Sequence, residues 1–324
     1  MKMYVGCDLG GTNIKVGVVD VETGEIVAVR SAPTLAREGH DAVMARMAEL
    51  VDRVIVNSGI SKTKIGGVGI GAPGMLDVDR GMVLFLPNLP GTWPNVPLAD
   101  TIGRKVNLPV FVLNDVRAIT FGEWKYGAGR GVDTMACFAI GTGIGGGLVI
   151  NGKLHLGING TAGELGHQTI NFNGPKCGCG NYGCVEAYAS GPAIAAAAVK
   201  IVMQGGTTVI GEMVNYDLNK ITPRVVYEAA MTGDETALEI YREAGKAIGV
   251  GVSNVLVTVS ARKVVIGGGV AAAGDLLLEP IRQAIQEHVF VMPKELVDVV
   301  PAELGTDAGI VGTALWASVH GYQN

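Results

Sequence analysis

The chain has 324 residues, of which 48% are hydrophobic and 17% charged, and this length and composition indicate a globular protein with room for two domains. Its formal net charge is −5 and it contains no basic run, so a nucleic-acid-binding surface is not expected. The apolar run at its start meets an acid by residue 8 and no apolar span approaches the length of a membrane helix, so we expect a cytoplasmic protein with reduced thiols and no membrane segment.

A β-meander is predicted first, with strands over residues 4–8, 14–20 and 25–31. Its first turn, DLGGTNIK, has the composition of a phosphate site and contains Asp8, Gly10, Gly11, Thr12 and Lys15. Glycine lets backbone amides approach a phosphate, Thr12 adds a hydroxyl donor, and Asp8 could hold Mg²⁺ through water. The alternative is a hairpin with incidental polar residues. The order of a Walker loop, G-K-[ST], is absent, which excludes that fold.

Apolar residues at helical spacing predict an amphipathic helix over residues 41–57, and a strand over 64–70 follows. This strand leads into the turn GAPG, which contains Gly74, and then into a loop that contains Asn88 and extends to residue 97. A backbone amide of the turn and the side chain of Asn88 are candidate ligand contacts. Ordinary turn residues are the alternative for both.

An apolar strand over residues 110–113 ends at Asn114 and Asp115, and a helix over 116–126 is predicted to follow. Ligands of open α/β sheets bind outside the carboxyl ends of the strands, so this pair is a candidate for the site. The alternative is that Asp115 caps the helix.

A second meander, ACFAIGTGIGGGLVINGKL, begins near residue 134 and repeats the layout of DLGGTNIKVGVVDVETGEI. Two related domains that each present a glycine-threonine turn would hold a polyphosphate from both sides. The pattern G-x-G-x-x-G occurs over residues 69–74 and 141–146. A loop and a strand follow these two copies, whereas a dinucleotide site needs a helix there, so neither copy supports a Rossmann site.

The segment over residues 164–186 contains a predicted metal site whose ligands are His167, Cys177, Cys179 and Cys184. One imidazole and three thiolates form a closed tetrahedral zinc site, which is typical of a structural ion. Three ordinary buried cysteines are the alternative. Glu164 and Glu186 flank the ligands, and we expect the metal to bring them together in the wall of a ligand pocket. Cys7 and Cys137 lie in apolar strands and are expected in the core.

The remainder of the chain alternates between helices and strands. Helices are predicted over residues 187–204, 222–232, 235–259, 276–289 and 308–319, and strands over 263–266 and 297–301. The range 235–259 contains either one or two helices. Gly267, Gly268 and Gly269 follow the first of these strands, and their missing side chains would let a flat ring or a sugar lie against the backbone.

In combination these motifs resemble the ROK family of sugar kinases and sugar-responsive repressors, over nearly the whole chain. The matching segments are DLGGTNIK, GAPG, LND, GTGIGGG, ELGHQ, CGCGNYGCVEAYASG and IGGGV. The resemblance implies an α/β fold of two actin-like, ribonuclease-H-like domains, with ATP and sugar in a cleft between them and a zinc loop. We expect a small domain over residues 1–117, closed by the C-terminal helix over 306–324, and a large domain over 118–305.

The resemblance also implies roles for individual residues. Asp115 matches the catalytic base. The positions that match sugar-binding residues are Gly74, Asn88, Asn114, Glu164, His167 and Glu186. The positions that match phosphate loops and nucleotide wall are Gly10, Gly11, Thr12, Thr142, Gly143, Gly268 and Gly269, beside Asp8 and Lys15. His167 would bind zinc through one ring nitrogen and face the sugar with the other. Residues 116–118, Val-Arg-Ala, depart from the smaller residues expected there.

Within the family the motifs are most similar to those of bacterial ATP-dependent glucokinases, which implies phosphorylation of glucose with ATP, Mg²⁺ and a structural Zn²⁺. N-acetylglucosamine, N-acetylmannosamine, fructose or allose as acceptor, and polyphosphate as donor, stay open. A sugar-sensing repressor is the other alternative, but repressors of the family carry a helix-turn-helix ahead of the kinase-like part, and a first strand at residue 4 leaves no room for one. A zinc module that binds nucleic acid is a further alternative, and the negative net charge of the chain argues against it. The expected partners are a sugar and a nucleotide, and a homodimer or homotetramer is expected by resemblance.

Overall fold

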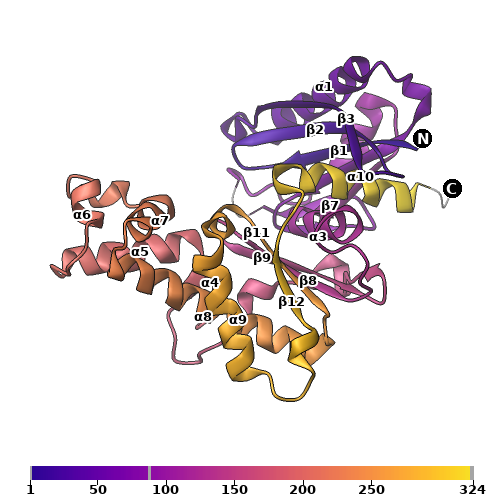
Figure 1. The fold of residues 1–324 in the computed structure, drawn as a ribbon. Coiled ribbons are helices and arrows are strands. Elements are labelled where there is room, and N and C mark those ends of the chain that lie inside the picture. Colours follow the sequence, from indigo (N-terminus) through magenta and orange to yellow (C-terminus); the bar gives the residue numbers. More distant parts are fainter. Residues whose placement is uncertain (1, 87–88, 322–324) are drawn as a thin grey trace. The chain divides into compact units, whose positions relative to one another are not determined.

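The computed structural model describes residues 2–86 and 89–321, and it has an α/β fold with two five-stranded sheets (Figure 1). The strand orders are β3-β2-β1-β4-β7 and β10-β9-β8-β11-β12, with β10 at Lys153–Leu154, and β5 and β6 form a separate hairpin. The predicted α/β class and the two predicted meanders are confirmed.

The chain forms two compact units. One contains Met1–Gly131, Lys153–Gly163 and Glu303–Asn324, and the other contains Val132–Gly152 and Glu164–Ala302. The domain limits expected from the sequence, 1–117 with 306–324 and 118–305, stay a prediction.

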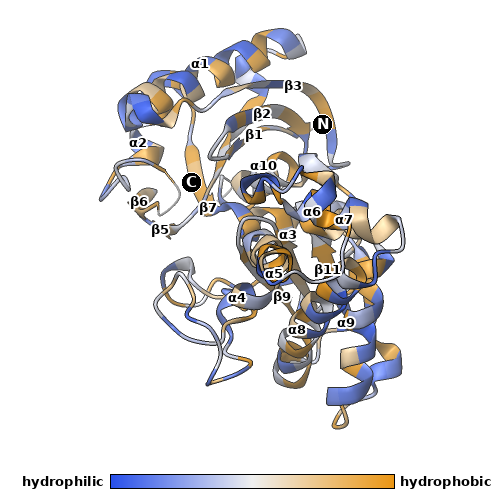
Figure 2. Cartoon of the chain, turned by 90° about the vertical axis from the view of Figure 1, so that its left-hand side faces the viewer, coloured by the Kyte–Doolittle hydropathy of each residue, from blue (hydrophilic) through white to orange (hydrophobic). Residues whose placement is uncertain are grey.

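The first unit has one mixed sheet with helices packed on it. Its strands are β1 (Met3–Leu9), β2 (Asn13–Asp20), β3 (Glu25–Pro33), β4 (Ile65–Ala72), β5 (Met75–Asp77), β6 (Met82–Phe85) and β7 (Val110–Asn114). Its helices are α1 (His40–Ser58), α2 (Leu98–Val106), α3 (Asp115–Tyr126) and α10 (Ala308–His320). The helix predicted over 41–57 is confirmed as α1, which carries both hydrophilic and hydrophobic residues (Figure 2). Its apolar residues Val43, Met47 and Val51 are fully buried in the core.

Strand direction places the carboxyl ends of three strands at one edge of this sheet. β1 pairs in parallel with β4, and β4 pairs in parallel with β7, whereas β2 and β3 are antiparallel. In this register Asp8 lies opposite Gly71, and Ala72 lies opposite Asn114. A turn or a helix N-terminus therefore follows each strand at the edge where ligands bind in open α/β sheets.

Helix α10 packs on this sheet across two glycines of neighbouring strands. A Cβ atom on Gly6 would lie 1.9 Å from the carbonyl oxygen of Ile310, and one on Gly69 would lie 1.8 Å from that of Thr313. Neither position has space for any side chain, so glycine is required for the helix backbone to approach the strands. The last helix of the chain is thereby held against its first strand.

The second unit has a mixed sheet covered by helices. Its strands include β8 (Met135–Ile140), β9 (Ile144–Ile150), β11 (Lys263–Gly267) and β12 (Asp298–Pro301). Its helices are α4 (Val185–Ala189), α5 (Gly191–Met203), α6 (Ile210–Met213), α7 (Pro223–Met231), α8 (Glu235–Val259) and α9 (Asp275–His288). Over 235–259, where one or two helices were predicted, there is one.

The single helix predicted over residues 187–204 is wrong, because the structure has two helices there. Ser190 separates α4 from α5 in an extended conformation, and its hydroxyl accepts a hydrogen bond from the amide of Ala193 at 3.4 Å. Pro192 follows in the first turn of α5, where a missing amide hydrogen costs nothing. A serine cap and a proline therefore start a new helix within an alanine-rich stretch.

Over residues 2–86 and 89–321, no helix has the length and apolar character needed to cross a bilayer.

Candidate active site

In the first unit, the parallel strands gather three carboxylate and amide side chains at one edge of the sheet. Asp8 is the sixth residue of β1, Asn114 is the last of β7, and Asp115 is the first of α3. The carbonyl oxygen of Gly74, in the turn after β4, accepts a hydrogen bond from Asn114 Nδ2 at 3.4 Å. The structure thus brings Asp8 and Gly74 to the neighbouring pair Asn114 and Asp115, although these segments lie far apart in the sequence.

Asn114, not Asp115, is the cap of helix α3. Its Oδ1 accepts hydrogen bonds from the amides of Val116 at 3.0 Å and Arg117 at 3.2 Å. The alternative that Asp115 is the N-cap is therefore wrong, because the helix already begins at Asp115. Oδ1 of Asp115 accepts from the amide of Val116 at 2.9 Å. A carboxylate in the first turn is stabilised by the helix dipole.

Asp8 lies in a confined, charged environment. The pKa of its carboxyl is raised from 3.8 to about 6, chiefly by burial and then by the charge of Asp115, while the charge of Lys15 opposes the shift. Gly309 of α10 allows this burial, since a Cβ atom there would lie 2.8 Å from the carboxyl carbon of Asp8. Two carboxylates share this edge of the sheet, and such an arrangement is typical of a site that holds a cation or moves a proton.

The turn after β1 is exposed and held by its own backbone. The amide of Gly10 donates to the carbonyl oxygen of Asn13 at 3.0 Å, and the hydroxyl of Thr34 donates to the carbonyl oxygen of Gly10 at 2.7 Å. Gly11 and Thr12 line a cavity of about 440 Å³ together with Arg37. The turn therefore places Gly11 and Thr12 beside a cavity, and its role as a phosphate loop stays a prediction.

Two other candidate residues of the first unit have different outcomes. Lys15 Nζ donates to the carbonyl and hydroxyl oxygens of Thr306, both at 3.1 Å, and forms an ion pair with Asp307 at 2.6 Å. These contacts use the three donors of the ammonium group, so Lys15 connects β2 to the turn before α10. Asn88 lies outside the described residues.

The predicted metal ligands of the second unit converge in space. Ligand atoms of His167, Cys177, Cys179 and Cys184 all lie within 4.8 Å of one another. His167 Nδ1 is 3.7 Å from Cys177 Sγ, and Cys179 Sγ is 3.8 Å from Cys184 Sγ. Sulfur atoms about 2.3 Å from a tetrahedral zinc ion lie about 3.8 Å from each other. The donor set and its spacing therefore fit zinc.

The loop that carries the thiols is shaped by two glycines. Gly180, with φ of 95°, lets the chain turn so that the amide of Cys177 donates to the carbonyl oxygen of Asn181 at 2.8 Å. Gly183, with φ of 65°, has no space for a Cβ atom beside the carbonyl oxygen of Asn171. Without a metal, burial raises the pKa of Cys177 to about 12. Because zinc binds thiolates, the ion must displace that proton.

The two glutamates that flank the metal ligands lie on either side of His167. Its Nε2 is 3.9 Å from a carboxylate oxygen of Glu164, and its Nδ1 is 3.9 Å from one of Glu186. Glu186 Oε2 accepts a hydrogen bond from the amide of Ile144 at 2.9 Å. A Cβ atom on Gly143 would lie 2.6 Å from that oxygen, so glycine is needed at this turn. Glu164, His167, Glu186 and the turn with Thr142 and Gly143 thus form one continuous group.

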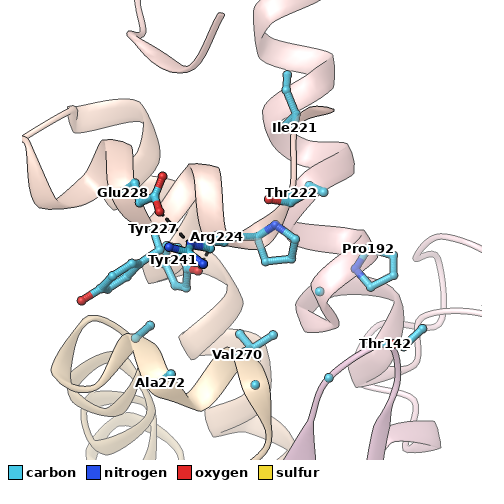
Figure 3. A pocket seen from close by; sticks show the side chains of 16 residues that line it. Thr142, Pro192, Ile221, Thr222, Arg224, Tyr227, Glu228, Tyr241, Val270 and Ala272 are labelled. Carbon is cyan, nitrogen blue, oxygen red and sulfur yellow. Dashed lines mark hydrogen bonds and ion pairs between the residues drawn. The ribbon is translucent and has the colours of Figure 1, made fainter. Parts of the chain in front are cut away.

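A cavity of about 760 Å³ in the second unit is lined by residues from distant segments (Figure 3). The lining residues include Gly141, Thr142, Gly191, Pro192, Ile221, Thr222, Pro223, Arg224, Tyr227, Glu228, Tyr241, Gly269 and Val270. The aromatic wall is held by Tyr241, whose hydroxyl donates to the carbonyl oxygen of Pro223 at 3.0 Å and whose ring lies edge-on to Tyr227. A cavity of this size, with apolar walls and few polar groups, can hold a small organic ligand.

Two glycines follow β11, and the second of them lines this cavity. Gly268 has φ of 87°, and a Cβ atom there would lie 2.3 Å from the carbonyl oxygen of Ile140. Gly269 follows and lines the cavity with Thr142. The structure therefore joins these candidate residues to Pro192, Thr222 and Tyr227, which sequence reasoning missed. The sequence signals near them were those of two helix starts, Ser-Gly-Pro at the start of α5 and Thr-Pro at the start of α7.

Known proteins are similar to this chain over nearly its whole length. The model of the ROK family matches residues 4–319. The chain is 36% identical to a glucokinase of Halalkalibacterium halodurans over 315 residues, which are 96% of this chain and 93% of that protein. The crystal structure of a ROK family glucokinase from Streptomyces griseus in complex with glucose and AMPPNP matches with a TM-score of 0.82 and 34% identity, over 98% of this chain and 99% of that one.

Regulators are also among the relatives. A xylose repressor of Caldicellulosiruptor bescii is 32% identical over 288 residues, which are 89% of this chain and 71% of the repressor. Similarity to kinases and to a repressor leaves the activity to be argued from the site residues.

Proposed function

Because this chain belongs to the ROK family, we propose that it is a hexose kinase that transfers the γ-phosphate of ATP to glucose. The glucokinases to which it is similar, one of them solved with glucose and AMPPNP, support this substrate pair. The observation that carries the proposal is the position of Asp115, at the carboxyl end of β7 and beside Asp8 and Asn114. A carboxylate there can accept a proton from a bound hydroxyl group.

We infer that Asp115 is the general base. A sugar hydroxyl is a very weak acid, so its oxygen needs a proton acceptor as it bonds to the γ-phosphorus. The proton passes to Asp115, the bond between the γ-phosphorus and the bridging oxygen breaks, and ADP leaves. The transition state of such a transfer is loose, so the protein contributes mainly by positioning groups and neutralising charge.

The sugar would be held by groups that donate to and accept from its hydroxyls. We assign this role to Gly74, Asn88, Asn114, Glu164, His167 and Glu186. Carboxylates accept and the amide of Asn114 donates, so a hydroxyl of the wrong configuration would leave a buried polar group unpaired. That penalty is the physical basis on which glucose would be distinguished from its epimers.

The nucleotide would be held by the glycine turns and the large cavity of the second unit. We assign the phosphates to Gly10, Gly11 and Thr12 and to Thr142 and Gly143, and the nucleoside to the cavity beside Gly268 and Gly269. Mg²⁺, when bound, would neutralise charge on the β- and γ-phosphates, with Asp8 among the carboxylates near it. An apolar cavity with an aromatic wall supports ATP as donor over polyphosphate, which has no ring to place there.

The metal cluster would have a structural role. Four protein ligands leave a zinc ion no open position for substrate. Zinc would fix His167 through Nδ1, and would thereby direct Nε2 and the two glutamates toward the sugar. The ion then acts on sugar affinity through the position of these side chains.

An ADP-release assay over a panel of hexoses, with ATP and separately with polyphosphate, tests the proposal. We expect the highest kcat/KM for glucose with ATP. Asp115→Asn should fold as wild type and lose roughly 10²–10⁴-fold in kcat, since the amide cannot accept the proton. A fully active Asp115→Asn variant would contradict the assignment of the base.

The same assay separates the alternatives. A higher kcat/KM for N-acetylglucosamine, N-acetylmannosamine, fructose or allose would keep the kinase and change the acceptor. Sugar binding measured by calorimetry, without ADP release from any hexose, would favour a sugar-sensing regulator, as the similarity to a xylose repressor suggests.

A further inference from the structure

Arg117 is a buried arginine in the first turn of α3, two residues after the proposed base. Its side chain is among the largest that are almost fully buried, with 2% of the residue exposed. It lies in the Val-Arg-Ala segment that departs from the expected family pattern. An arginine loses its hydration on burial and is retained only where its donors are used, so its contacts indicate what it does.

The guanidinium of Arg117 contacts two separate parts of the first unit. Its Nη1 donates to Oδ1 of Asn114 at 2.9 Å. Its Nε donates to the carbonyl oxygen of Ala162 at 2.9 Å, and its Nη2 donates to that of Thr161 at 3.2 Å. One side chain therefore connects the carboxyl end of β7 with the loop over residues 153–163, which belongs to the same compact unit.

The contact with Asn114 adds a third donor to the two helix amides that set which way its side-chain amide faces. Oδ1 of Asn114 accepts from the guanidinium and from the amides of Val116 and Arg117. A guanidinium has no acceptor, so the amide cannot exchange its oxygen and nitrogen without facing donor against donor. Nδ2 is consequently directed to the turn of Gly74, as a donor only.

The contacts with the loop act on the segment before Glu164. Ala162 is also held by its amide, which donates to the carbonyl oxygen of Leu156 at 2.8 Å. Gly163 alone separates Ala162 from Glu164 in the chain. Arg117 thus fixes the backbone from which the chain continues to a proposed sugar ligand.

We propose that Arg117 is a positioning residue for sugar binding: it orients the amide of Asn114 as a hydrogen-bond donor and holds the loop that leads to Glu164. This inference rests on the proposed hexose kinase function. A hydroxyl that meets Asn114 must then accept there and donate its own proton elsewhere. Arg117 touches neither substrate nor phosphate in this role, so its loss acts on sugar affinity more than on nucleotide affinity.

Two variants test the role. Arg117→Lys keeps the positive charge, but an ammonium group lacks the planar array of donors that contacts Asn114 and both carbonyl oxygens. Arg117→Met removes all of these donors and keeps a side chain of similar length. We expect Arg117→Lys to raise the KM for the sugar about tenfold, the usual effect of a misplaced polar partner, and to leave the KM for ATP within about twofold. Arg53→Lys, an exposed arginine of α1 in the same unit, is the matched control and should change neither constant.

Hydrogen exchange supplies a readout that does not depend on turnover. Amides over residues 158–163 should exchange faster in both Arg117 variants than in wild type and in Arg53→Lys. Variants that unfold, or that lose stability with sugar KM and loop exchange unchanged, would assign Arg117 a structural role alone and overturn the proposal. A wild-type chain that phosphorylates no hexose would refute the proposed function instead, and the exchange measurement would still decide whether Arg117 holds the loop.

Discussion

Asp8 illustrates at the residue scale how a functional position can cost stability. The pKa of its carboxyl is raised from 3.8 to about 6 in the folded chain, chiefly by burial and then by the charge of Asp115. The folded state therefore binds this proton more tightly than the unfolded state does. Between about pH 4 and pH 6 the carboxyl is ionised in the unfolded chain but still protonated in the folded chain. The contribution of Asp8 to the free energy of unfolding therefore falls as the pH rises through this range.

We predict that Asp8→Asn stabilises the protein in magnesium-free buffer at pH 7.5 by on the order of 2 kcal/mol, because it removes the ionised carboxyl. The gain should shrink as pH falls below about 6 and the wild-type carboxyl takes up its proton. Denaturant unfolding of both proteins at pH 5 and 7.5 measures it. If Asp8→Asn were less stable than wild type at pH 7.5, the contacts of the ionised carboxylate would outweigh the cost of burying its charge.

Glu123 is a buried carboxylate that stabilises the fold and has no proposed part in ligand binding. Glu123 of α3 is fully buried, and its carboxylate accepts from the amides of Ala128, Glu303 and Leu304 at 2.9, 3.1 and 2.8 Å. It thereby attaches the end of α3 to the segment before α10. Buried carboxylates are retained where backbone donors satisfy them, and this one serves the fold of the unit.

At the scale of elements, the segment over residues 164–186 has little apolar surface of its own. It contains short turns and isolated bridges between Thr169 and Cys184 and between Lys176 and Tyr182. Such a loop is held in one conformation when a metal bridges its ends. The cluster of His167 and three thiols is the only feature of the segment with that capacity.

We predict that Cys179→Ser, or a strong chelator added to wild type, lowers the midpoint of thermal unfolding and raises the KM for the sugar several-fold. The loss of one thiolate weakens the ion that fixes His167. Calorimetry measures the midpoint, kinetics measure the KM, and elemental analysis measures the zinc content. The chelator should have little further effect on Cys179→Ser, which makes the variant its own control. Purified wild-type protein that contains no zinc would contradict the metal site.

At the scale of the whole molecule, the first compact unit is completed by the end of the chain. Helix α10 packs on β1 and β4 through Gly6, which meets Ile310, and Gly69, which meets Thr313, so the sheet with Asp8 and Asn114 depends on residues more than 200 positions further along the chain. Such distant contacts form late and cooperatively in folding.

We predict that Gly69→Ala destabilises the protein by about 3 kcal/mol, at the upper end for an overpacked core, because the new methyl group overlaps the backbone of Thr313. The midpoint of urea unfolding, followed by tryptophan fluorescence because Trp316 lies on α10, measures the loss. Gly103→Ala is the control, since its nearest atom outside the helix is 3.3 Å away. An unchanged midpoint in Gly69→Ala would mean that α10 is not seated by this contact.

The sequence by itself determined the strands of the two five-stranded sheets, the glycine turns, the candidate metal ligands and the position of the Asn114-Asp115 pair at a strand end, but it missed the β5-β6 hairpin and helix α2. These features depend on neighbours close in the chain, through burial at spacings of two or four residues and through turn chemistry. The break between α4 and α5 at Ser190 escaped the pattern because alanine-rich residues continue on both sides.

Only the tertiary structure decided which of these pieces meet. The parallel order of β1, β4 and β7 brings Asp8 to Asn114, and the cavity beside Gly269 gathers Thr142, Pro192 and Tyr227 from segments that share no local signal. The burial of Arg117 also became visible only there. Contacts between distant segments are fixed by how whole elements pack and exclude one another, which no window of neighbouring residues encodes.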